Sequence, residues 1–360
     1  MMFTTSESTS ELEKFEKRTF TKWEKVTSVS SFTSATREFT KYIKDNFGLR
    51  KDFSQTYAKL KYHITSQSHD IDKYAVGKNG WLFLNDDHYI DRSYGNTNLD
   101  SHTVEYKVNI LKKRADWLHS KGIKYYILYI PKKTIVYPEL IPNQYQTLVK
   151  NRRTSSADII LDKLRGYPNL EIINTTDVIL KSKSKKHPLY LKTDTHWTHY
   201  GAFIAYRKFI SSLCQNHKNI NPELDYEDVK FSQVSFAGIG DLESYSNMPN
   251  TFSSQDVIAS IINNQKENIS TTKNPKKYTS PLVYMSKLSI NPNQVNSPKI
   301  LFYHDSFMLS LMKFIKPHFS ESLFLWARDF DKSMVNEFKP DILVHEFYGR
   351  VFESYIVETE

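Results

Sequence analysis

Short apolar segments alternate with helical segments along most of the chain, and this alternation constrains its fold more than any other feature. The clearest apolar segment, residues 125–130, is closed by Pro131, as is typical of a parallel strand buried on both faces. Further strands are predicted at 170–174, 299–303, 323–326 and 342–347, and helices at 101–120, 155–165, 200–215, 307–316 and 332–337. Strands that alternate with helices predict a three-layer α/β domain with a mostly parallel sheet.

The front of the chain has a different pattern. Residues 1–70 are predicted to form an N-terminal helical arm, with helical spacing at 11–25 and 33–70 and a break at Gly48. No apolar run approaches the roughly 20 residues that a membrane span needs, and the first residues lack the apolar region of a signal peptide. The sequence alone therefore predicts a soluble protein that is not exported.

Residues 71–360 are predicted to form one main domain. It begins with a hairpin over 76–84, because a turn of Asn79 and Gly80 precedes a short apolar run. Within this domain, residues 217–297 are polar and rich in Asn, Ser and Lys, so we expect a long insertion with little regular structure there.

The composition excludes several classes of protein. Cys214 is the only cysteine, which excludes internal disulfides and cysteine-based metal sites, and we expect it to be a small buried side chain on a helix. Neither a P-loop motif nor a dinucleotide-binding glycine motif occurs. The 49 Lys and Arg residues outnumber the 40 Asp and Glu residues, giving a net charge of +9 that attracts polyanions. The short lysine clusters within 181–186 and 273–277 match no nucleic-acid-binding motif, so no nucleic-acid partner is expected.

Ser306 is the first candidate for chemistry. It follows the apolar strand predicted at 299–303 and comes directly after Asp305, just before a predicted helix. Reactive groups in open α/β sheets lie at the carboxyl ends of strands, where the free N–H groups of a helix start can stabilise an oxyanion. Ser306 is therefore a candidate nucleophile. The alternative is that Asp305 or Ser306 only caps the helix.

Asp194 and His196 form the second candidate, in a turn before the helix predicted at 200–215. A carboxylate in this position can fix the tautomer of the imidazole and support its protonated form, so that the ring can take a proton from a serine hydroxyl. Together with Ser306 they would supply the three parts of an acyl-transfer triad. Two alternatives stay open: a structural turn with a packed histidine, and a metal site of Asp194, His196 and His199, whose spacing matches no strong metal signature.

Several short motifs occur in an order that is typical of one known family. Residues 77–83 read GKNGWLF, residues 194–197 read DTHW and are followed by Gly201, and Asp305-Ser306 follows a histidine at a position that is usually glycine. The fourth match is the P-x-K-x-x-x-Y-P stretch at 131–138, the D-x-F-G-x-R stretch at 45–50 also fits, and the G-D-L element at 240–242 is a weaker match. Over roughly residues 35–352 the chain resembles the SGNH-hydrolase-like O-acetyltransferases of the alginate AlgJ/AlgX type.

This resemblance implies both a fold and a set of catalytic roles. The fold is an SGNH-hydrolase-like domain that is circularly permuted, because the chain order here is Asp, His and then Ser. By resemblance, Ser306 is the nucleophile, His196 is the general base and Asp194 is its orienting partner. The resemblance implies no metal and no other cofactor.

Five other residues are predicted to contribute to the site or to its support. Gly240 is a candidate oxyanion donor, and Trp197 and Lys133 are candidate substrate-binding residues. The alternatives are a core aromatic for Trp197 and a surface lysine after a strand for Lys133. Glu346 and Arg350, at the end of the last predicted strand, are expected to form a structural pair.

The implied function is transfer of acetyl groups to hydroxyls of a bacterial exopolysaccharide or capsule through an acetyl-serine intermediate. The implied partners are an acidic polysaccharide acceptor, which the excess positive charge suits, and an acetyl donor that a membrane acyltransferase could deliver. Two alternatives stay open: a carbohydrate esterase or deacetylase with the same triad, and a non-catalytic glycan-binding assembly protein. The resemblance implies the periplasm or cell envelope, against the cytoplasm that the sequence alone indicates.

Overall fold

The computed structural model describes residues 50–354 with gaps at 184–185, 237–238, 249–250, 263–267, 279, 281–283, 285 and 328, together with residues 13, 19, 20, 41, 42 and 356. Of the predicted N-terminal arm, one helix is described, α3 (Arg50–Thr65). The predicted break at Gly48 and the D-x-F-G-x motif before Arg50 lie outside the described residues. Within the described ranges, no helix is both long and apolar enough to cross a bilayer.

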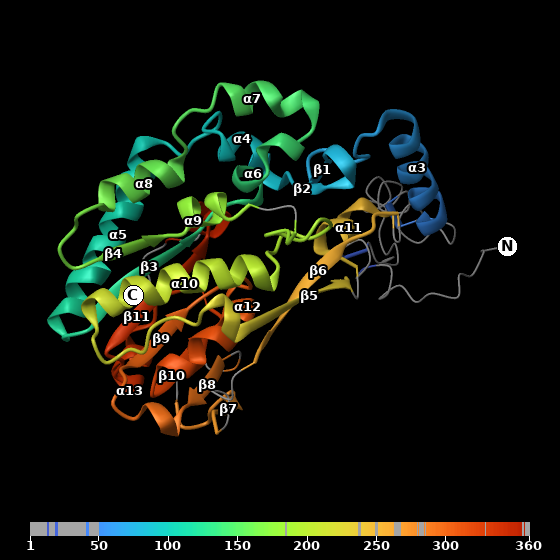
Figure 1. Ribbon diagram of the computed structural model, residues 1–360. Coiled ribbons are helices and arrows are strands. Elements are labelled where there is room, and N and C mark those ends of the chain that lie inside the picture. The colour runs from blue at the N-terminus through green and yellow to red at the C-terminus, as the bar shows by residue number, and fades with distance from the viewer. Residues whose placement is uncertain are drawn as a thin grey trace, which may run out of the picture.

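A seven-stranded sheet forms the centre of the molecule (Figure 1). Its spatial order is β4 (Glu171–Asn174), β3 (Lys124–Ile130), β11 (Ile342–Tyr348), β9 (Lys299–Tyr303), β10 (Glu321–Leu325), β8 (Ser286–Ile290) and β7 (Ser270–Lys273). The first five strands are parallel, and β8 and β7 continue the sheet in antiparallel pairing. The predicted α/β class and its mostly parallel sheet are confirmed.

Helices cover both faces of this sheet. The main ones are α5 (Ser101–Ser120), α8 (Ser156–Leu164), α10 (His199–Asn216), α12 (Met308–Ile315) and α13 (Lys332–Phe338). Neighbouring residues of β3 show the two faces: Tyr125 interacts with Arg114 of α5, whereas the hydroxyl of Tyr126 lies 3.0 Å from the ring of His217, just after α10. Because successive side chains of a strand point to opposite faces, α5 and α10 lie on opposite sides of the sheet.

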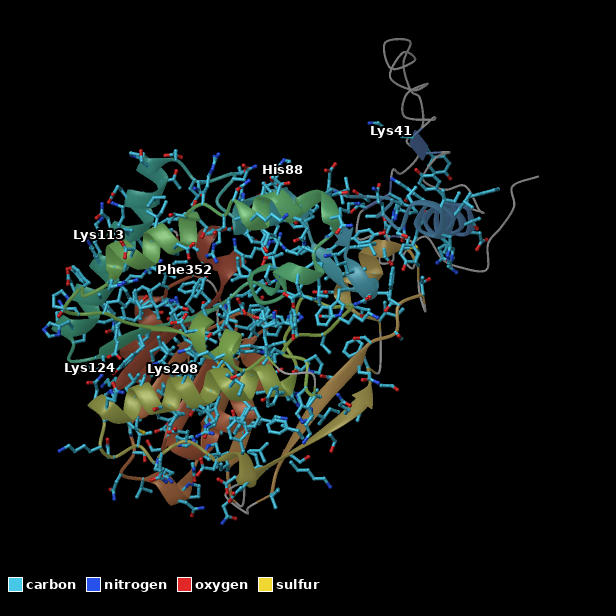
Figure 2. All side chains as sticks on the ribbon, turned by 45° about the horizontal axis from the view of Figure 1, so that its top comes forward. Lys41, His88, Lys113, Lys124, Lys208 and Phe352 are labelled. Atoms are coloured by element: carbon cyan, nitrogen blue, oxygen red, sulfur yellow. The ribbon has the colours of Figure 1, made fainter. Side chains whose placement is uncertain are left out.

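The core between these layers is apolar and aromatic. All seven residues of β11 are buried, and the rings of Phe302 and Phe324 stack across β9 and β10 with centroids 5.0 Å apart. Figure 2 shows Phe352 inside this packed body and Lys124 at its surface. Each large apolar side chain that is buried in this way contributes roughly 1.5–3 kcal/mol. Cys214 is an exception to the prediction, since its side chain on α10 is only half-buried.

The smaller predicted hairpin is also present. β1 (Tyr74–Val76) and β2 (Leu82–Leu84) pair antiparallel, and the turn between them places Asn79 and Gly80 at positive φ. These two residue types adopt that backbone region most readily, which is why the sequence signals the turn.

The prediction of little regular structure over 217–297 is wrong. β5 (Val229–Ser235) and β6 (Gln255–Ile261) pair antiparallel, α11 (Asp241–Ser246) lies between them, and β7 and β8 extend the central sheet. All four residues of β7 are exposed, so the strand has no apolar pattern. Backbone hydrogen bonds hold such strands whatever their side chains are, and a polar composition therefore hides them.

Three neighbouring parallel strands end at the same edge of the sheet. β9 leads to Ser306, β11 leads to Arg350 through α14 (Gly349–Ser354), and β3 leads to Lys133 in α6 (Lys133–Val136). The carboxyl ends of parallel strands lie at one edge, which is where open α/β sheets place their ligands.

Candidate active site

Ser306 lies in a short loop that polar contacts fix on both sides. The N–H of Asp305 donates to Glu346 of β11 at 3.1 Å, and the Asp305 carboxylate accepts from the N–H groups of Phe307 at 2.9 Å and Tyr348 at 3.0 Å. The side chain of Asp305 therefore joins the end of β9 to the end of β11. This contact fixes the direction in which the loop presents the serine.

His196 is presented by a closed turn that lies outside the central sheet. The ends of this turn pair at Tyr190 and Trp197, and the N–H of Leu191 donates to the carbonyl of His196 at 3.0 Å. Inside the turn, Asp194 Oδ1 accepts from the N–H of His196 at 2.9 Å. This Asx-type contact holds the imidazole ring of His196 next to the Asp194 carboxylate that orients it.

The two segments meet. His196 Nδ1 lies 2.6 Å from Asp194 Oδ1, and His196 Nε2 lies 2.6 Å from Ser306 Oγ. An ionised carboxylate can only accept, so Nδ1 carries the proton and Nε2 of the neutral ring accepts the serine O–H. The structure thus brings together all three residues predicted from two distant motifs, in the geometry of a nucleophile, a base and an orienting acid.

The pKa values fit this arrangement. Burial alone raises the pKa of Asp194, but the hydrogen bonds and charge of His196 and the N–H of Asp241 outweigh it and lower that pKa to about 2. Burial alone lowers the pKa of His196, but the hydrogen bond and charge of Asp194, with the charges of Asp241 and Asp305, raise it above 6.5 overall. The acid is therefore ionised, and the ring takes up a proton more readily than a free imidazole.

Asp241 is a site residue that sequence reasoning missed. Its carboxylate accepts from the N–H of Thr195 at 2.8 Å and from the hydroxyl of the same residue, while its own N–H donates to Asp194 Oδ2 at 2.9 Å. One carboxylate oxygen lies 3.9 Å from His196 Nδ1. The only sequence signal for Asp241 was the weak G-D-L element that contains it.

The alternative metal site is not assembled as proposed. His199 Nδ1 lies 2.7 Å from Lys313 Nζ and 3.2 Å from the N–H of Ala259, away from the triad. Among the described residues, the group with metal-like spacing is instead Asp194, His196 and Asp241, with ligand atoms within 4.8 Å of one another. In that group, His196 Nδ1 and both oxygens of Asp194 are already engaged in hydrogen bonds with protein groups. These donors therefore fit a triad better than a metal centre.

The remaining predicted residues support the site from behind. Trp197 is buried, and its indole N–H donates to the carbonyl of Phe307 at 3.0 Å, so it ties the two segments together and does not line the pocket. Gly240 does not line the pocket either. It packs closely against the backbone carbonyl of Thr193. Lys133 is buried, which contradicts the surface alternative.

The predicted pair of Glu346 and Arg350 is wrong. Arg350 instead lies 2.6 Å from Asp86, and Glu346 points to the backbone of Asp305. Burial and the nearby charge of Asp305 raise the pKa of Glu346 well above its usual value, so this side chain is neutral and has no need of a cation.

A pocket of about 250 Å³ opens in front of the triad. Its walls include Ser306, His196, Asp241, Tyr245, Trp326 and Arg350. Trp326 is 37% exposed, which leaves an aromatic face available to a ligand. The pocket therefore combines a nucleophile, a base, an aromatic surface and a cation.

Comparison with known proteins identifies the family to which the chain belongs. Residues 75–276 match the family model of the SGNH hydrolase-like domain of the acetyltransferase AlgX, and this match covers more than half of the chain. The protein belongs to this family of SGNH hydrolase-like acetyltransferase domains, as the sequence motifs predicted. No protein of curated function matches the chain in sequence.

Two solved structures show the same fold at low identity, and a third is a weaker match. Bacillus cereus PatB1 is 14% identical with a TM-score of 0.58, covering 78% of this chain and 98% of its own. A DHHW family protein from Eubacterium siraeum is 12% identical with a TM-score of 0.53, covering 79% and 93%. The O-acetyltransferase domain of Pseudomonas putida AlgJ is 16% identical with a TM-score of 0.48, covering 78% and 92%.

Proposed function

We propose that this protein is an O-acetyltransferase that moves acetyl groups to hydroxyls of a bacterial exopolysaccharide or capsule through an acetyl-serine intermediate at Ser306. The observation that carries the proposal is the line of contacts from Asp194 to His196 to Ser306, each 2.6 Å long. Membership in an acetyltransferase family supports acetyl as the group that is transferred.

In the first half-reaction, His196 Nε2 takes the proton of Ser306 Oγ as the oxygen attacks the carbonyl carbon of the acetyl donor. The tetrahedral intermediate collapses, its bond to the leaving group breaks, and His196 returns the proton to that group. The carboxylate of Asp194 stabilises the imidazolium that forms between these events. The products are acetyl-Ser306 and the deacetylated donor.

The oxyanion of the intermediate needs N–H donors. The N–H of Ser306 has no acceptor among the described residues, and Ser306 lies two residues before α12, in the loop that leads into the helix. One such donor contributes roughly 3 kcal/mol to a transition state of this kind. We infer that this N–H is one donor of the oxyanion hole.

In the second half-reaction, a sugar hydroxyl replaces the donor. His196 takes the hydroxyl proton, the sugar oxygen attacks the acetyl carbon, and the bond to Ser306 Oγ breaks as that oxygen regains a proton from His196. Trp326 offers a partly exposed aromatic face for the sugar ring. Water in place of the sugar would make the same site an esterase.

The test is mass spectrometry of the protein after incubation with an activated acetyl ester. The expected result is one acetyl group on Ser306, absent in Ser306→Ala and released when an acceptor glycan is added. Acetate release that an added glycan leaves unchanged would instead identify an esterase. A protein that gains no acetyl group and binds glycan would identify a non-catalytic assembly role.

The acceptor and compartment are part of the same proposal. The net charge of +9 supports an acidic polysaccharide acceptor, and transfer to such a polymer should weaken as salt rises. Transfer to a neutral glycan should depend much less on salt. Family resemblance supports a place at the cell envelope, which fractionation of cells that express the native gene would test.

A further inference from the structure

Lys133 has no place in the chemistry above, yet it is among the most buried charged groups of the described residues. Its Nζ donates to three backbone carbonyls, those of Leu82 at 2.7 Å, Lys192 at 3.0 Å and Asp194 at 3.0 Å. An ammonium has three N–H donors, so these contacts use all of them. A buried cation with no carboxylate within hydrogen-bond distance needs such a set of acceptors.

These three acceptors come from two separate segments. Leu82 belongs to β2 of the hairpin, whereas Lys192 and Asp194 belong to the turn that presents His196. The two segments also meet directly, because the N–H of Leu82 donates to the carbonyl of Lys192 at 3.0 Å. Lys133 itself is at the start of α6, after the central strand β3, so it ties the turn to the core.

The hairpin provides the walls of the lysine site. Lys133 Nζ lies 5.0 Å from the ring centroid of Trp81 and 5.3 Å from that of Phe83, distances at which aromatic faces attract a cation. This contact gives a physical reason for the apolar end of the GKNGWLF motif at residues 77–83. The rings of Trp81 and Phe83 enclose the ammonium of Lys133, which binds the turn that carries His196.

We propose that Lys133 is a positioning residue that fixes the backbone of Asp194 and so aims its carboxylate at His196. Asp194 connects Lys133 to His196. Its backbone carbonyl accepts a hydrogen bond from Lys133. Its carboxylate accepts hydrogen bonds from the ring and N–H of His196 and from the N–H of Asp241. The inference rests on the proposed function, since it concerns the same triad.

Lys133 also acts on the charge balance of the site. The charged groups that face it are the carboxylates of Asp194 and Asp241, which raise its pKa, but burial is the larger effect and lowers that pKa to about 7. The ammonium is therefore charged in acid and loses its proton near neutral pH. Asp194 raises the pKa of His196, so an Asp194 carboxylate that is no longer aimed at the ring should lower that pKa.

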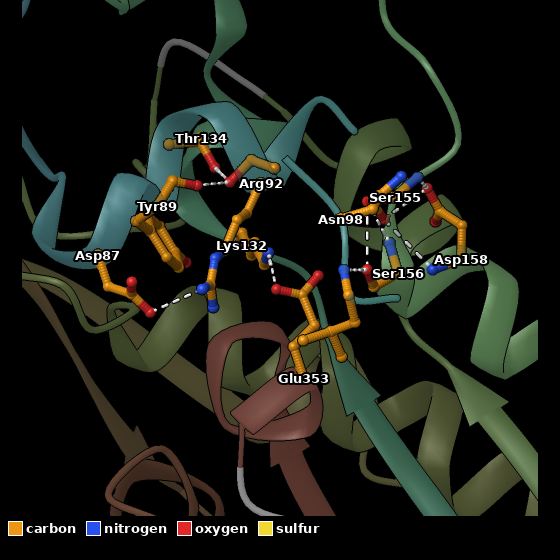
Figure 3. Close-up of polar contacts among 12 residues, drawn as sticks. Asp87, Tyr89, Arg92, Asn98, Lys132, Thr134, Ser155, Ser156, Asp158 and Glu353 are labelled. Atoms are coloured by element: carbon orange, nitrogen blue, oxygen red, sulfur yellow. Dashed lines mark hydrogen bonds and ion pairs between the residues drawn. The ribbon is translucent and has the colours of Figure 1, made fainter. Parts of the chain in front are cut away.

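The neighbouring residue provides a matched control. Lys132 is equally buried, but its Nζ lies 2.8 Å from the carboxylate of Glu353 of α14 (Figure 3). Figure 3 shows this pair among Tyr89, Arg92 and Thr134, none of which belongs to the catalytic turn. The double variant Lys132→Met/Glu353→Gln removes a buried ammonium and its partner, neither of which lines the pocket.

The experiment measures the rate at which an activated acetyl ester acetylates Ser306, from pH 5 to pH 9, in folded samples checked by circular dichroism. We expect Lys133→Met to lower the rate about 100-fold, as small displacements of reacting groups do. We expect the acidic limb of its pH profile to move to lower pH, because a misdirected Asp194 no longer supports the protonated ring. We expect Lys133→Gln, which keeps two N–H donors, to fall between Lys133→Met and the wild type. The Lys132/Glu353 variant should keep the wild-type profile.

A purely structural role would lower stability and leave the rate per folded molecule and its pH profile unchanged, and this result would overturn the inference. If Lys133→Met fails to fold, Lys133→Gln carries the same test. The proposed function fails separately: wild-type protein that gains no acetyl group on Ser306 contradicts the triad itself. A wild type that reacts, with Lys133 variants that react equally well, contradicts only the role of Lys133.

Discussion

The two halves of the site are held by different physical means. The half that carries Ser306 is an extension of the core, since β9 is buried in the sheet and both Asp305 and Glu346 have almost no solvent exposure. The half that carries His196 is a turn outside the sheet, held by hydrogen bonds from charged groups. A buried strand end and the backbone hydrogen bonds of Asp305 therefore fix the nucleophile, whereas hydrogen bonds between side chains of opposite charge and from a buried lysine fix the base. Changes to the base half should alter rate and pH dependence, and changes to the nucleophile half should alter stability.

The largest effect should come from the carboxylate of the base half. Asp194→Asn keeps the shape but places an amide against His196 Nδ1, which favours the wrong tautomer of the ring. We expect the rate of Ser306 acetylation to fall by roughly 10⁴-fold, with little change in the urea midpoint. A fall of less than about tenfold would mean that Asp194 does not orient the base.

A steric change next to the turn should have the second largest effect. A Cβ on Gly240 would lie 2.2 Å from the carbonyl oxygen of Thr193, although the backbone of Gly240 at φ −60° suits alanine. Gly240→Ala must therefore move α11 and the N–H of Asp241 away from Asp194. We expect a loss of about 100-fold in acetylation rate.

A glycine far from the site separates this effect from a general one. Gly166 has a positive φ of 74° with open space around it. Gly166→Ala should lower stability and leave the rate of folded protein unchanged. Equal rate losses in the two variants would remove the special role of the contact between Gly240 and Thr193.

The same contrast explains what the sequence could and could not predict. Ser306 and His196 are visible because a strand end and an acid two residues from a histidine are local patterns, and the core strands are visible as apolar runs. Asp241 is 47 residues from the carboxylate that it supports, in a segment that the sequence predicted to have little regular structure. Its role depends on where that segment folds back, which no local pattern encodes.

The positioning role of Lys133 could not be predicted from the sequence, for a related reason. A lysine directly after a strand is usually exposed, and here its burial depends on the rings of Trp81 and Phe83 and on three carbonyls from other segments. Similarly, Glu346 was expected to pair with Arg350 because opposite charges close in sequence suggest a salt bridge. The burial that makes Glu346 neutral is a property of the assembled sheet.

A smaller effect, mainly on pH dependence, is expected at Asp241. Its charge raises the pKa of His196, so Asp241→Asn should lower that pKa. Acetylation requires the neutral ring, and its rate therefore rises as pH increases through this pKa. The acidic limb of the Asp241→Asn profile should move to lower pH, with a rate at pH 8 within about tenfold of the wild type. A shift to higher pH would contradict the proposed charge balance.

The smallest effect on rate should come from Glu346→Gln in the nucleophile half. Glu346 is neutral, and glutamine keeps both its shape and the oxygen that accepts the N–H of Asp305. We expect a rate within about twofold of the wild type and a stability within about 1 kcal/mol at pH 5. A loss of more than about 3 kcal/mol there would indicate that the carboxylate is ionised and that its charge is needed.

The pH dependence of that stability tests the same protonation state. A carboxyl whose pKa is raised by folding holds its proton in the folded protein and loses it in the unfolded chain, so its contribution to stability is lost as pH rises above its unfolded pKa of about 4.5. Glutamine has no proton to lose, and urea unfolding should therefore show Glu346→Gln gaining stability relative to the wild type between pH 5 and pH 8. If the difference between the two proteins stays constant over that range, Glu346 is not a buried neutral acid, and the nucleophile half depends on charge as the base half does.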